Sequence, residues 1–396
     1  MKKFYILLIA IFAINAATAQ WLRLNSGVST RLMSVHFVNE NIGFAVGGNN
    51  YTSVIIKTTN GGSDWITQNP GNTPQLNSVC FTDEYTGYAV GGLYNMEILK
   101  TANGGSTWIL KTISGSIILN SVHFPVANTG YAVGYNGKIL KTTNGGTTWI
   151  SQASGTTQWL KSVFFLNANT GYVVGNFGTI LKTSNGGVNW TTKVSGTSVD
   201  LQSVFMVDAT KGYVVGYYGT ILKTNNGGTN WVLIGSGTYS NLWSVFFSEL
   251  HTGYATGDGG TILKTTNDGL DWTIQTSGTY SALNSIFFTD ANTGYAVGNN
   301  GTILKTTNGG YPVGMYDLSS ETNTLSIFPN PSSSQITIET PAKGHLSILN
   351  ISGQRLLHQE ITESTTTIDI STLPSGVYVV KLVGEKGVQA GKFIKQ

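Results

Sequence analysis

The chain has 396 residues, a formal net charge of +3 and only 10% charged residues, against about a quarter in typical globular domains. A chain so close to neutral does not favour binding to nucleic acid or to a charged membrane surface. The single cysteine, Cys80, excludes an internal disulfide framework.

Residues 1–19 have the features of a secretory signal peptide. Lys2 and Lys3 supply positive charge, Phe4 to Ile14 is apolar, and Ala17-Thr18-Ala19 places small residues before Gln20. The apolar run is too short to span a bilayer, and no other segment is expected to be a transmembrane segment.

Residues 20–314 repeat one sequence unit. The sequence Lys-Thr-x-Asn-Gly/Asp-Gly occurs seven times, and five tryptophans follow it at intervals of 41 residues: Trp108, Trp149, Trp190, Trp231 and Trp272. Each copy predicts four short strands; in the fourth copy these are 160–166, 171–175, 179–183 and 188–194. Such repetition favours an all-β, seven-bladed β-propeller.

The two ends of the repeat predict how the ring closes. Residues 21–27 resemble a fourth strand standing alone, whereas the seventh copy has Val313 where the other copies have tryptophan. We expect the N-terminal strand to pair beside the strand around Lys305, joining the last blade to the first and leaving no open edge.

Residues 315–323 are predicted to be a linker, and 324–396 a small Ig-like β-sandwich, with strands at 335–339, 345–350, 355–358, 366–370 and 377–383. Phe328-Pro329-Asn330-Pro331, Leu373-Pro374-Ser375-Gly376-Val377-Tyr378 and Lys392-Phe393-Ile394-Lys395 resemble the type A C-terminal sorting domain of the type IX secretion system of Bacteroidota. The resemblance implies type IX secretion machinery as a partner, and export through the periplasm to the outer-membrane surface or the medium.

The repeats also resemble a known family. Thr142 to Trp149 is similar to the Asp-box, or BNR repeat, and together with the Gly-Tyr-Ala/Val-Val-Gly strand it resembles the photosystem II assembly and stability factors. This resemblance covers residues 21–312 and implies a binding or assembly scaffold; a monomer without cofactors is expected. Asparagine replaces the usual aspartate and is predicted to form the turns structurally, at Asn60, Asn103, Asn144, Asn185, Asn226, Asn267 and Asn308.

Other repeated positions are interpreted as structural. The seven lysines of the repeat are expected to form a solvated ring, and the Gly-Tyr tyrosines to pack internally. One position holds His36, Cys80 and His123 in the first three copies and phenylalanine in the other four. These are metal-ligand types, but we expect each to face its own seam between blades, so no metal site is predicted.

Catalysis is not expected. The resemblance to sialidases would imply three arginines, but the propeller has only Arg23 and Arg31. Asp83, Asp208, Glu249 and Asp290 follow the first strand of their copies, where acidic residues are common turn formers. The alternative is an extracellular glycoside hydrolase of the Asp-box propeller type, which would need a pair of facing carboxylates.

The copies differ most around the start of the first strand, which is expected to line the rim of a central channel. Aromatic, amide and charged residues replace one another there, as expected of a surface that binds a glycan or a protein. Trp159 and Trp243 are expected to form a shelf beside Tyr239 and Tyr280; the alternative is scattered surface aromatics without a ligand. The candidate ligand-binding residues are Arg31, Trp159, Lys161, Asp200, Tyr239, Trp243 and Tyr280.

Overall fold

The computed structural model describes residues 20–71, 73–93, 95–113, 117–311, 325–340, 343–350, 355–384 and 387–396. The chain divides into two compact units, Met1–Val313 and Gly314–Gln396. The expected signal peptide, the linker at 315–323 and Val313 lie outside the described residues. No helix in the described ranges is long and apolar enough to cross a membrane.

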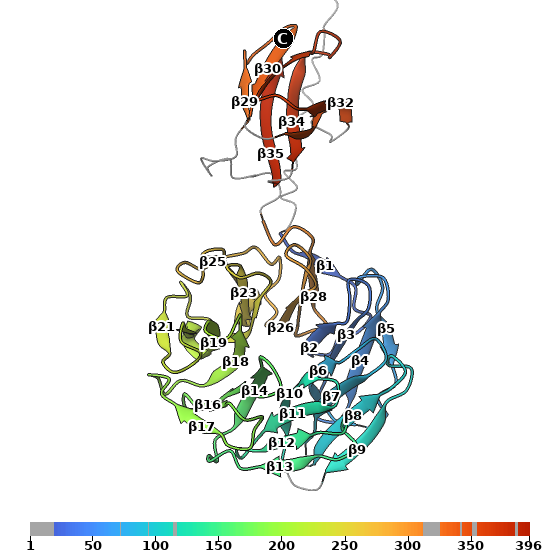
Figure 1. Cartoon of the computed structure of the whole chain (residues 1–396). Coiled ribbons are helices and arrows are strands. Elements are labelled where there is room, and N and C mark those ends of the chain that lie inside the picture. Colours follow the sequence, from blue (N-terminus) through green and yellow to red (C-terminus); the bar gives the residue numbers. More distant parts are fainter. Residues whose placement is uncertain are drawn as a thin grey trace, which may run out of the picture. The chain divides into compact units, whose positions relative to one another are not determined.

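The described part of the first unit contains seven four-stranded antiparallel sheets arranged in a ring (Figure 1). We call the sheets blades one to seven in the order of their first strands. The first strands are β2 (Leu32–Phe37), β6 (Leu76–Phe81), β10 (Leu119–Val126), β14 (Leu160–Phe165), β18 (Leu201–Met206), β22 (Leu242–Phe247) and β26 (Leu283–Phe288). The second strands are β3 (Gly43–Gly48), β7 (Gly87–Gly91), β11 (Thr129–Gly134), β15 (Gly171–Gly175), β19 (Gly212–Gly216), β23 (Gly253–Gly257) and β27 (Gly294–Gly298).

The third strands are β4 (Ser53–Thr58), β8 (Met96–Thr101), β12 (Ile139–Thr142), β16 (Ile180–Thr183), β20 (Ile221–Thr224), β24 (Ile262–Thr265) and β28 (Ile303–Thr306). The fourth strands are β5 (Ile66–Gln68), β9 (Ile109–Ile113), β13 (Ile150–Gln152), β17 (Thr191–Lys193), β21 (Val232–Ile234), β25 (Thr273–Ile274) and, in blade seven, β1 (Leu22–Leu24). Single 3-10 turns, η1 (Tyr217–Gly219) and η2 (Asp258–Gly260), join the second and third strands of blades five and six. The prediction of an all-β chain with repeated four-stranded sheets is confirmed.

The second strand of each blade is buried on both faces because a neighbouring blade covers each side. This explains its uninterrupted apolar sequence, as in Gly171-Tyr-Val-Val-Gly175. Gly171 permits close approach of its neighbour, since a Cβ there would lie 2.4 Å from the Phe165 ring. The glycine at the start of the strand is therefore a packing requirement.

Serine hydroxyls connect the first strands around the whole ring. The serine two residues after the repeated leucine accepts a hydrogen bond from a backbone N–H of the next blade at 3.2 to 3.4 Å in all seven cases, from Ser34 to Val79 onward and from Ser285 back to Val35. The first strands also contact one another in a closed cycle in which β26 meets β2. The ring is thus closed by the same contact that joins its consecutive blades.

The seven lysines of the repeat do not form a solvated ring, so that expectation is wrong. Each Nζ donates to a carbonyl in the Asn-Gly turn of the next blade at 2.6 to 2.8 Å, for example Lys100 to Gly145. In six blades a buried tyrosine hydroxyl donates to the same carbonyl, as Tyr88 does to Gly145. The ammonium also lies 5.3 to 5.7 Å from the centre of the aromatic ring on the second strand. The lysines therefore hold adjacent blades together.

The asparagine of each turn makes the contacts of a turn-forming residue. The Asn144 carbonyl Oδ1 accepts from the backbone N–H of Thr148 at 2.9 Å, and the Thr142 hydroxyl accepts from the N–H of Gly146 at 2.9 Å. Gly146 has φ +79°, and a Cβ on it would lie 2.8 Å from the Tyr88 ring. The turn therefore needs glycine at that position both for its backbone conformation and for packing.

The N-terminal strand pairs with β28 as expected, with Leu22 opposite Lys305. Trp21, just before this strand, is 1% exposed and packs in blade seven against Tyr254 and Phe288. It occupies in blade seven the place that Trp65 takes in blade one, since each indole lies beside the second glycine of the turn. The chain thus supplies the last blade with both a strand and a tryptophan from its N-terminal end.

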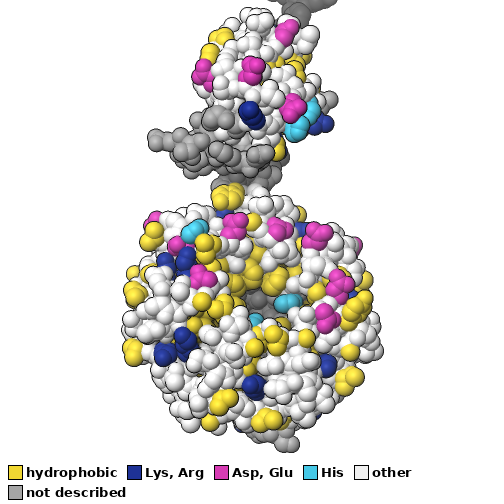
Figure 2. Space-filling view, viewed as in Figure 1, with side chains coloured by type: hydrophobic (Ala, Val, Ile, Leu, Met, Phe, Trp, Pro, Cys, Tyr) yellow, Lys and Arg dark blue, Asp and Glu magenta, His cyan; other side chains and the backbone are white. Residues whose placement is uncertain are grey.

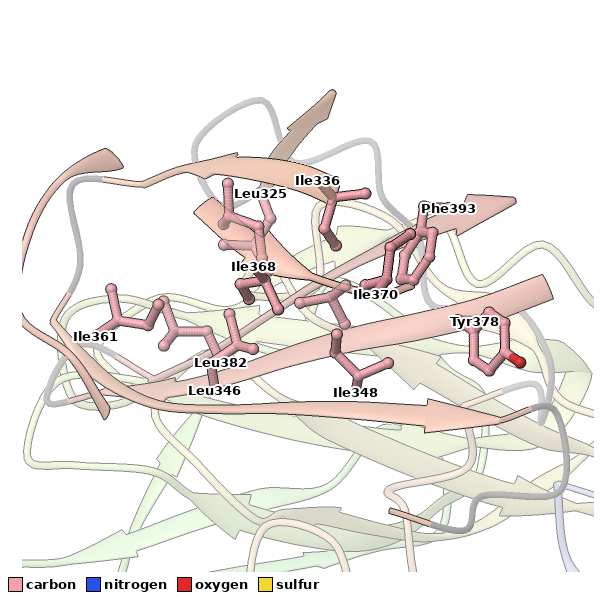
Figure 3. Packing of buried hydrophobic residues seen from close by; sticks show 12 residues of the cluster. Leu325, Ile336, Leu346, Ile348, Ile361, Ile368, Ile370, Tyr378, Leu382 and Phe393 are labelled. Atoms are coloured by element: carbon pink, nitrogen blue, oxygen red, sulfur yellow. The ribbon is translucent and has the colours of Figure 1, made fainter. Parts of the chain in front are cut away.

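The second unit consists of two sheets around one core. One sheet is formed by β29 (Ser326–Phe328), β30 (Gln335–Glu339) and β33 (Thr365–Asp369), and the other by β32 (Arg355–Ile361), β31 (Gly344–Asn350), β34 (Gly376–Gly384) and β35 (Gly387–Lys395). Alternate apolar residues of both sheets meet between them, among them Ile336, Ile348 and Phe393 (Figure 3). The Tyr378 hydroxyl donates to the Pro374 carbonyl, which ties the Leu-Pro-Ser-Gly segment to β34.

Candidate functional site

A cavity of about 340 Å³ lies at one mouth of the central channel of the propeller. The residue after the repeated leucine lines it in every blade: Met33, Asn77, Asn120, Lys161, Gln202, Trp243 and Asn284. Arg31, Gln75 and Ile118, from just before that leucine, add to the wall, as does Tyr135. The hairpins of blades one and two contribute Asn50, Gly92 and Leu93. The cavity therefore collects the positions at which the sequence copies differ, including three candidates, Arg31, Lys161 and Trp243.

Asparagine at this position has a structural role. The amides of Asn77, Asn120 and Asn284 donate to the leucine carbonyl of the next blade at 2.9, 2.7 and 2.8 Å. In the other four blades this link is lost, because the position holds another residue: Met33, Lys161, Gln202 or Trp243. Three of these replacements, Lys161, Gln202 and Trp243, stand on consecutive blades four, five and six.

Trp159 and Lys161 form a cluster with Tyr135 from the β11–β12 hairpin. The rings of Tyr135 and Trp159 are parallel within 8°, with centroids 3.9 Å apart. Lys161 Nζ lies 5.3 Å from the centre of the Trp159 ring and 5.5 Å from that of Tyr135. Burial lowers the pKa of Lys161, and the nearby Asp200 acts in the opposite direction. Although stacked on one side, Trp159 stays 44% exposed.

Trp243 belongs to a second cluster, on blades five and six. Its indole N–H donates to the Asp258 carboxylate at 2.7 Å, and Asn241 donates to the other oxygen at 2.9 Å. Tyr217 packs edge-on against Trp243 with centroids 5.5 Å apart. Sequence reasoning did not single out Asp258; the signal for it was Asp258-Gly259-Gly260 in a hairpin where four other copies have asparagine or tyrosine.

The expected shelf of Trp159, Trp243, Tyr239 and Tyr280 is not formed. Each tryptophan packs instead against a hairpin tyrosine, because the hairpins reach over the starts of the first strands: the N–H of Asn176 donates to the Trp159 carbonyl at 2.9 Å. Tyr239 and Tyr280 are 91% and 96% exposed and do not line the cavity. Asp200 lies at the rim, where it accepts a hydrogen bond from the N–H of Phe177 at 2.9 Å. In the hairpins of blades one and two, which are longer than those of the other blades, Tyr51 is exposed and Tyr94 lies outside the described residues.

Three of the four acidic residues considered for catalysis form turns. Asp83, Asp208 and Asp290 each accept two backbone N–H groups of their own turn at 2.7 to 2.8 Å. A hydrogen bond from the Thr210 hydroxyl holds the pKa of Asp208 below its usual value, and smaller contributions come from backbone N–H groups and from Lys211. The fourth acidic residue, Glu249, lies near Lys264. Burial lowers the pKa of Lys264, and the charge of Glu249 acts in the opposite direction.

The position shared by His36, Cys80 and His123 forms a ring around the channel. Its aromatic members contact one another in sequence, with centroid distances from His123 through Phe164, Phe205, Phe246 and Phe287 to His36 of 5.2, 5.1, 5.0, 5.3 and 5.1 Å. Each of these residues was expected to face its own seam between two blades. They form a ring instead, because the innermost strands lie closest to the axis. Figure 2 shows hydrophobic and histidine side chains gathered around a hollow at the centre of one face. Within the described ranges, no three His, Cys, Asp or Glu side chains are placed to hold a metal ion.

The two histidines of this ring are held neutral. Burial among aromatic side chains lowers the pKa of His36 to about 4. The pKa of His123 is also lowered to about 4, mainly by burial and to a smaller extent by the charge of His36. The His123 Nδ1 accepts from the backbone N–H of Phe165 at 3.2 Å, as a neutral ring can. Burial likewise raises the pKa of the Cys80 thiol to about 11. Both kinds of shift favour uncharged side chains on the channel wall.

Comparisons with known proteins find matches in both parts of the chain. Residues 109–195 and 151–238 match the family model of the Photosynthesis system II assembly factor YCF48, and residues 326–396 match that of the Secretion system C-terminal sorting domain. A comparison with curated proteins found no match.

Solved structures similar to this chain include YCF48 propellers and an enzyme. YCF48 bound to D1 peptide is 17% identical, with a TM-score of 0.62 over 73% of this chain and 95% of that chain. YCF48 from Cyanidioschyzon merolae is 20% identical, with a TM-score of 0.61 over 72% and 98%. The GH74 enzyme of Niastella koreensis is 13% identical, with a TM-score of 0.60 over 94% of this chain and 74% of the enzyme. At these identities the likeness shows the fold alone. The chain is therefore a β-propeller protein with BNR repeats like those of the photosystem II assembly factor YCF48, followed by a type IX C-terminal sorting domain.

Proposed function

We propose that this is a non-catalytic binding protein whose propeller recognises a glycan or a protein at the channel mouth. The sorting domain indicates a secreted protein; the finer proposal is a surface-displayed or released monomer that reaches its place through the periplasm. In this proposal, the seven sheets are the blades of one closed propeller in residues 20–314, the signal peptide is residues 1–19, and residues 324–396 form an Ig-like sandwich that engages the type IX machinery.

The observation that carries the proposal is the stacking of Trp159 on Tyr135, a residue that lines the cavity. Stacking fixes the orientation of the Trp159 ring, and yet 44% of this residue remains in contact with solvent. A rigid aromatic face beside a polar cavity is suited to a sugar ring or an apolar peptide side chain, because it loses little conformational entropy on binding. The amides that line the same cavity could bond to hydroxyl or peptide groups.

The carboxylates near the mouth support a binding role over a catalytic one. No acidic residue is among the described residues that line the cavity. Asp200 accepts from a backbone N–H, and both oxygens of Asp258 accept from neighbouring side chains. A glycoside hydrolase needs two carboxylates free to act on the bond that is cleaved. The likeness to the GH74 enzyme keeps hydrolysis as the alternative, at the level of the fold.

The test combines ligand screening with substitutions at the mouth. A glycan array and a surface pull-down with the purified full chain identify a ligand, and its affinity is then measured for Trp159→Ala and Trp243→Ala. We expect each change to weaken binding by about 1–3 kcal/mol with little change in the melting curve, because the other copies carry smaller side chains of several kinds at these positions. Tyr239→Ala is the matched control, since Tyr239 is exposed and lies outside the cavity.

Three results would count against the proposal. They are full affinity in both tryptophan variants, loss of binding only together with loss of the fold, and release of reducing sugars from a glycan on incubation with the protein. The last result would favour the hydrolase, and Asp258→Asn and Asp200→Asn would then show whether the rim carboxylates are involved.

A further inference from the structure

The cavity carries positive charge without a balancing carboxylate in its wall. Arg31 on blade one and Lys161 on blade four are the charged residues among its described lining, and no aspartate or glutamate is among them. Blades one and four lie on opposite sides of a seven-membered ring, so the two cations approach the cavity from different sides. An anionic group in the cavity would be attracted from both sides.

The arc from Lys161 to Gln202 also presents hydrogen-bond donors that have no acceptor. The Gln202 side-chain nitrogen is buried and has no partner among the described residues. The Lys161 ammonium contacts the two aromatic rings, and within the described ranges no oxygen accepts a hydrogen bond from it. The asparagines at the same position in blades two, three and seven, by contrast, give their N–H groups to backbone carbonyls. Buried donors without partners are costly unless a ligand supplies the acceptor.

The nearby carboxylates do not fill this need. Asp200 affects the pKa of Lys161 but does not line the cavity, and it accepts the N–H of Phe177. Asp258 is bonded to Trp243 and Asn241. A ligand with an acceptor group can therefore bond to both Lys161 and Gln202.

This inference rests on the proposed binding function and specifies its ligand. We propose that the cavity binds a carboxylated oligosaccharide: its carboxylate accepts hydrogen bonds from Lys161 and Gln202, and a sugar ring lies on the exposed face of Trp159. Arg31 attracts the same charge from the opposite wall. A sugar suits the whole site because Tyr135, the amides and the free donors line one cavity of about 340 Å³, the volume of a few sugar rings at most, and Trp159 stacks on Tyr135.

Pairs of probes in which one member has carboxylates and the other has neutral groups in their place test the proposal. Isothermal titration of the purified full chain would compare tetragalacturonate with its methyl ester, a hyaluronan hexasaccharide with its carboxyl-reduced form, and tetramannuronate with mannotetraose. We expect at least one acid to bind at least tenfold more tightly than its neutral partner. Lys161→Gln should reduce that affinity at least fivefold, and Gln202→Glu should reduce it more than Gln202→Leu, because it adds a like charge.

Lys193→Gln is the matched control, since it removes the same charge from the outer strand β17. Equal losses for Lys161→Gln and Lys193→Gln would overturn the inference, because they would indicate unspecific attraction. Binding of neutral sugars or of a peptide that depends on Trp159 but not on Lys161 would also overturn it, while leaving the proposed function in place. If no probe, array glycan or captured protein depends on the mouth residues, both the inference and the proposed function fail.

Discussion

Replacing Trp21 with alanine is expected to destabilise the propeller by opening the seam that closes it. Trp21 is 1% exposed and lies in the core of blade seven, where it meets Tyr254 and Phe288 edge-on at 6.4 and 5.9 Å. It precedes β1, whose three residues pair with β28. The substitution removes the largest side chain of this core and leaves a cavity beside the strand that completes the sheet.

The magnitude follows from the cost of emptying a packed site. Removal of a buried tryptophan or phenylalanine side chain costs about 3–5 kcal/mol, which includes the lost aromatic contacts. For a unit of this size each kcal/mol lowers the melting temperature by about 2 °C, so we expect a decrease of about 6–10 °C. Deletion of residues 20–27, which also removes the strand pairing, should cost more.

Thermal melting of the full chain, followed by circular dichroism, provides the assay. Leu22→Ala is the control for a neutral change, because Leu22 is 63% exposed in the same strand. Trp65→Ala is the control for scale, because Trp65 packs in the equivalent place in blade one. If Trp21→Ala melts within about 2 °C of the parent while Trp65→Ala does not, the N-terminal segment does not close the ring and the reasoning is refuted.

Two further predictions concern delivery and pH. A chain that ends after Thr322 should fold but stay in the periplasm of a host with type IX machinery, while the full chain reaches the surface or medium; equal secretion of both, measured by immunoblotting of the fractions, would contradict the sorting role. The double variant His36→Phe, His123→Phe, which copies the phenylalanine of four other blades, should lose less stability in acid than the parent. Both histidines are neutral in the folded and unfolded states above pH 6.5, but between pH 6.5 and about 4 only the unfolded chain takes up their protons, so the parent loses stability in that window. Each shift corresponds to at most about 3 kcal/mol, reduced because the rings are partly exposed to the channel. Urea unfolding at pH 7 and pH 4.5 measures the difference, and an equal loss in both proteins would contradict the prediction.

The sequence by itself determined the features that arise within one repeat or from the spacing of repeats. The Thr-x-Asn-Gly turn, its required glycine and the alternation of four short strands are local, so residues such as Asn144 and Gly146 could be interpreted without coordinates. The pairing of the N-terminal strand with β28 also followed from counting strands, because the repeats leave one strand over at the N-terminal end and lack one in the last copy. The sorting motifs are short and ordered, and they were recognisable for the same reason.

Only the tertiary structure decided what happens between blades and at the channel mouth. Lys100 and Gly145 are 45 residues apart, so no local pattern shows that the lysine is held by the next blade. The same holds for the ring that joins His123 to Phe164 and for the stacking of Trp159 on Tyr135 rather than beside Tyr239. The repeat period brings equivalent positions close to one axis, but which side chains then contact one another depends on the radius of the ring and the reach of each hairpin. These distances between blades, which exist only in the folded ring, also leave Lys161 and Gln202 without hydrogen-bond acceptors among the residues that the structure describes.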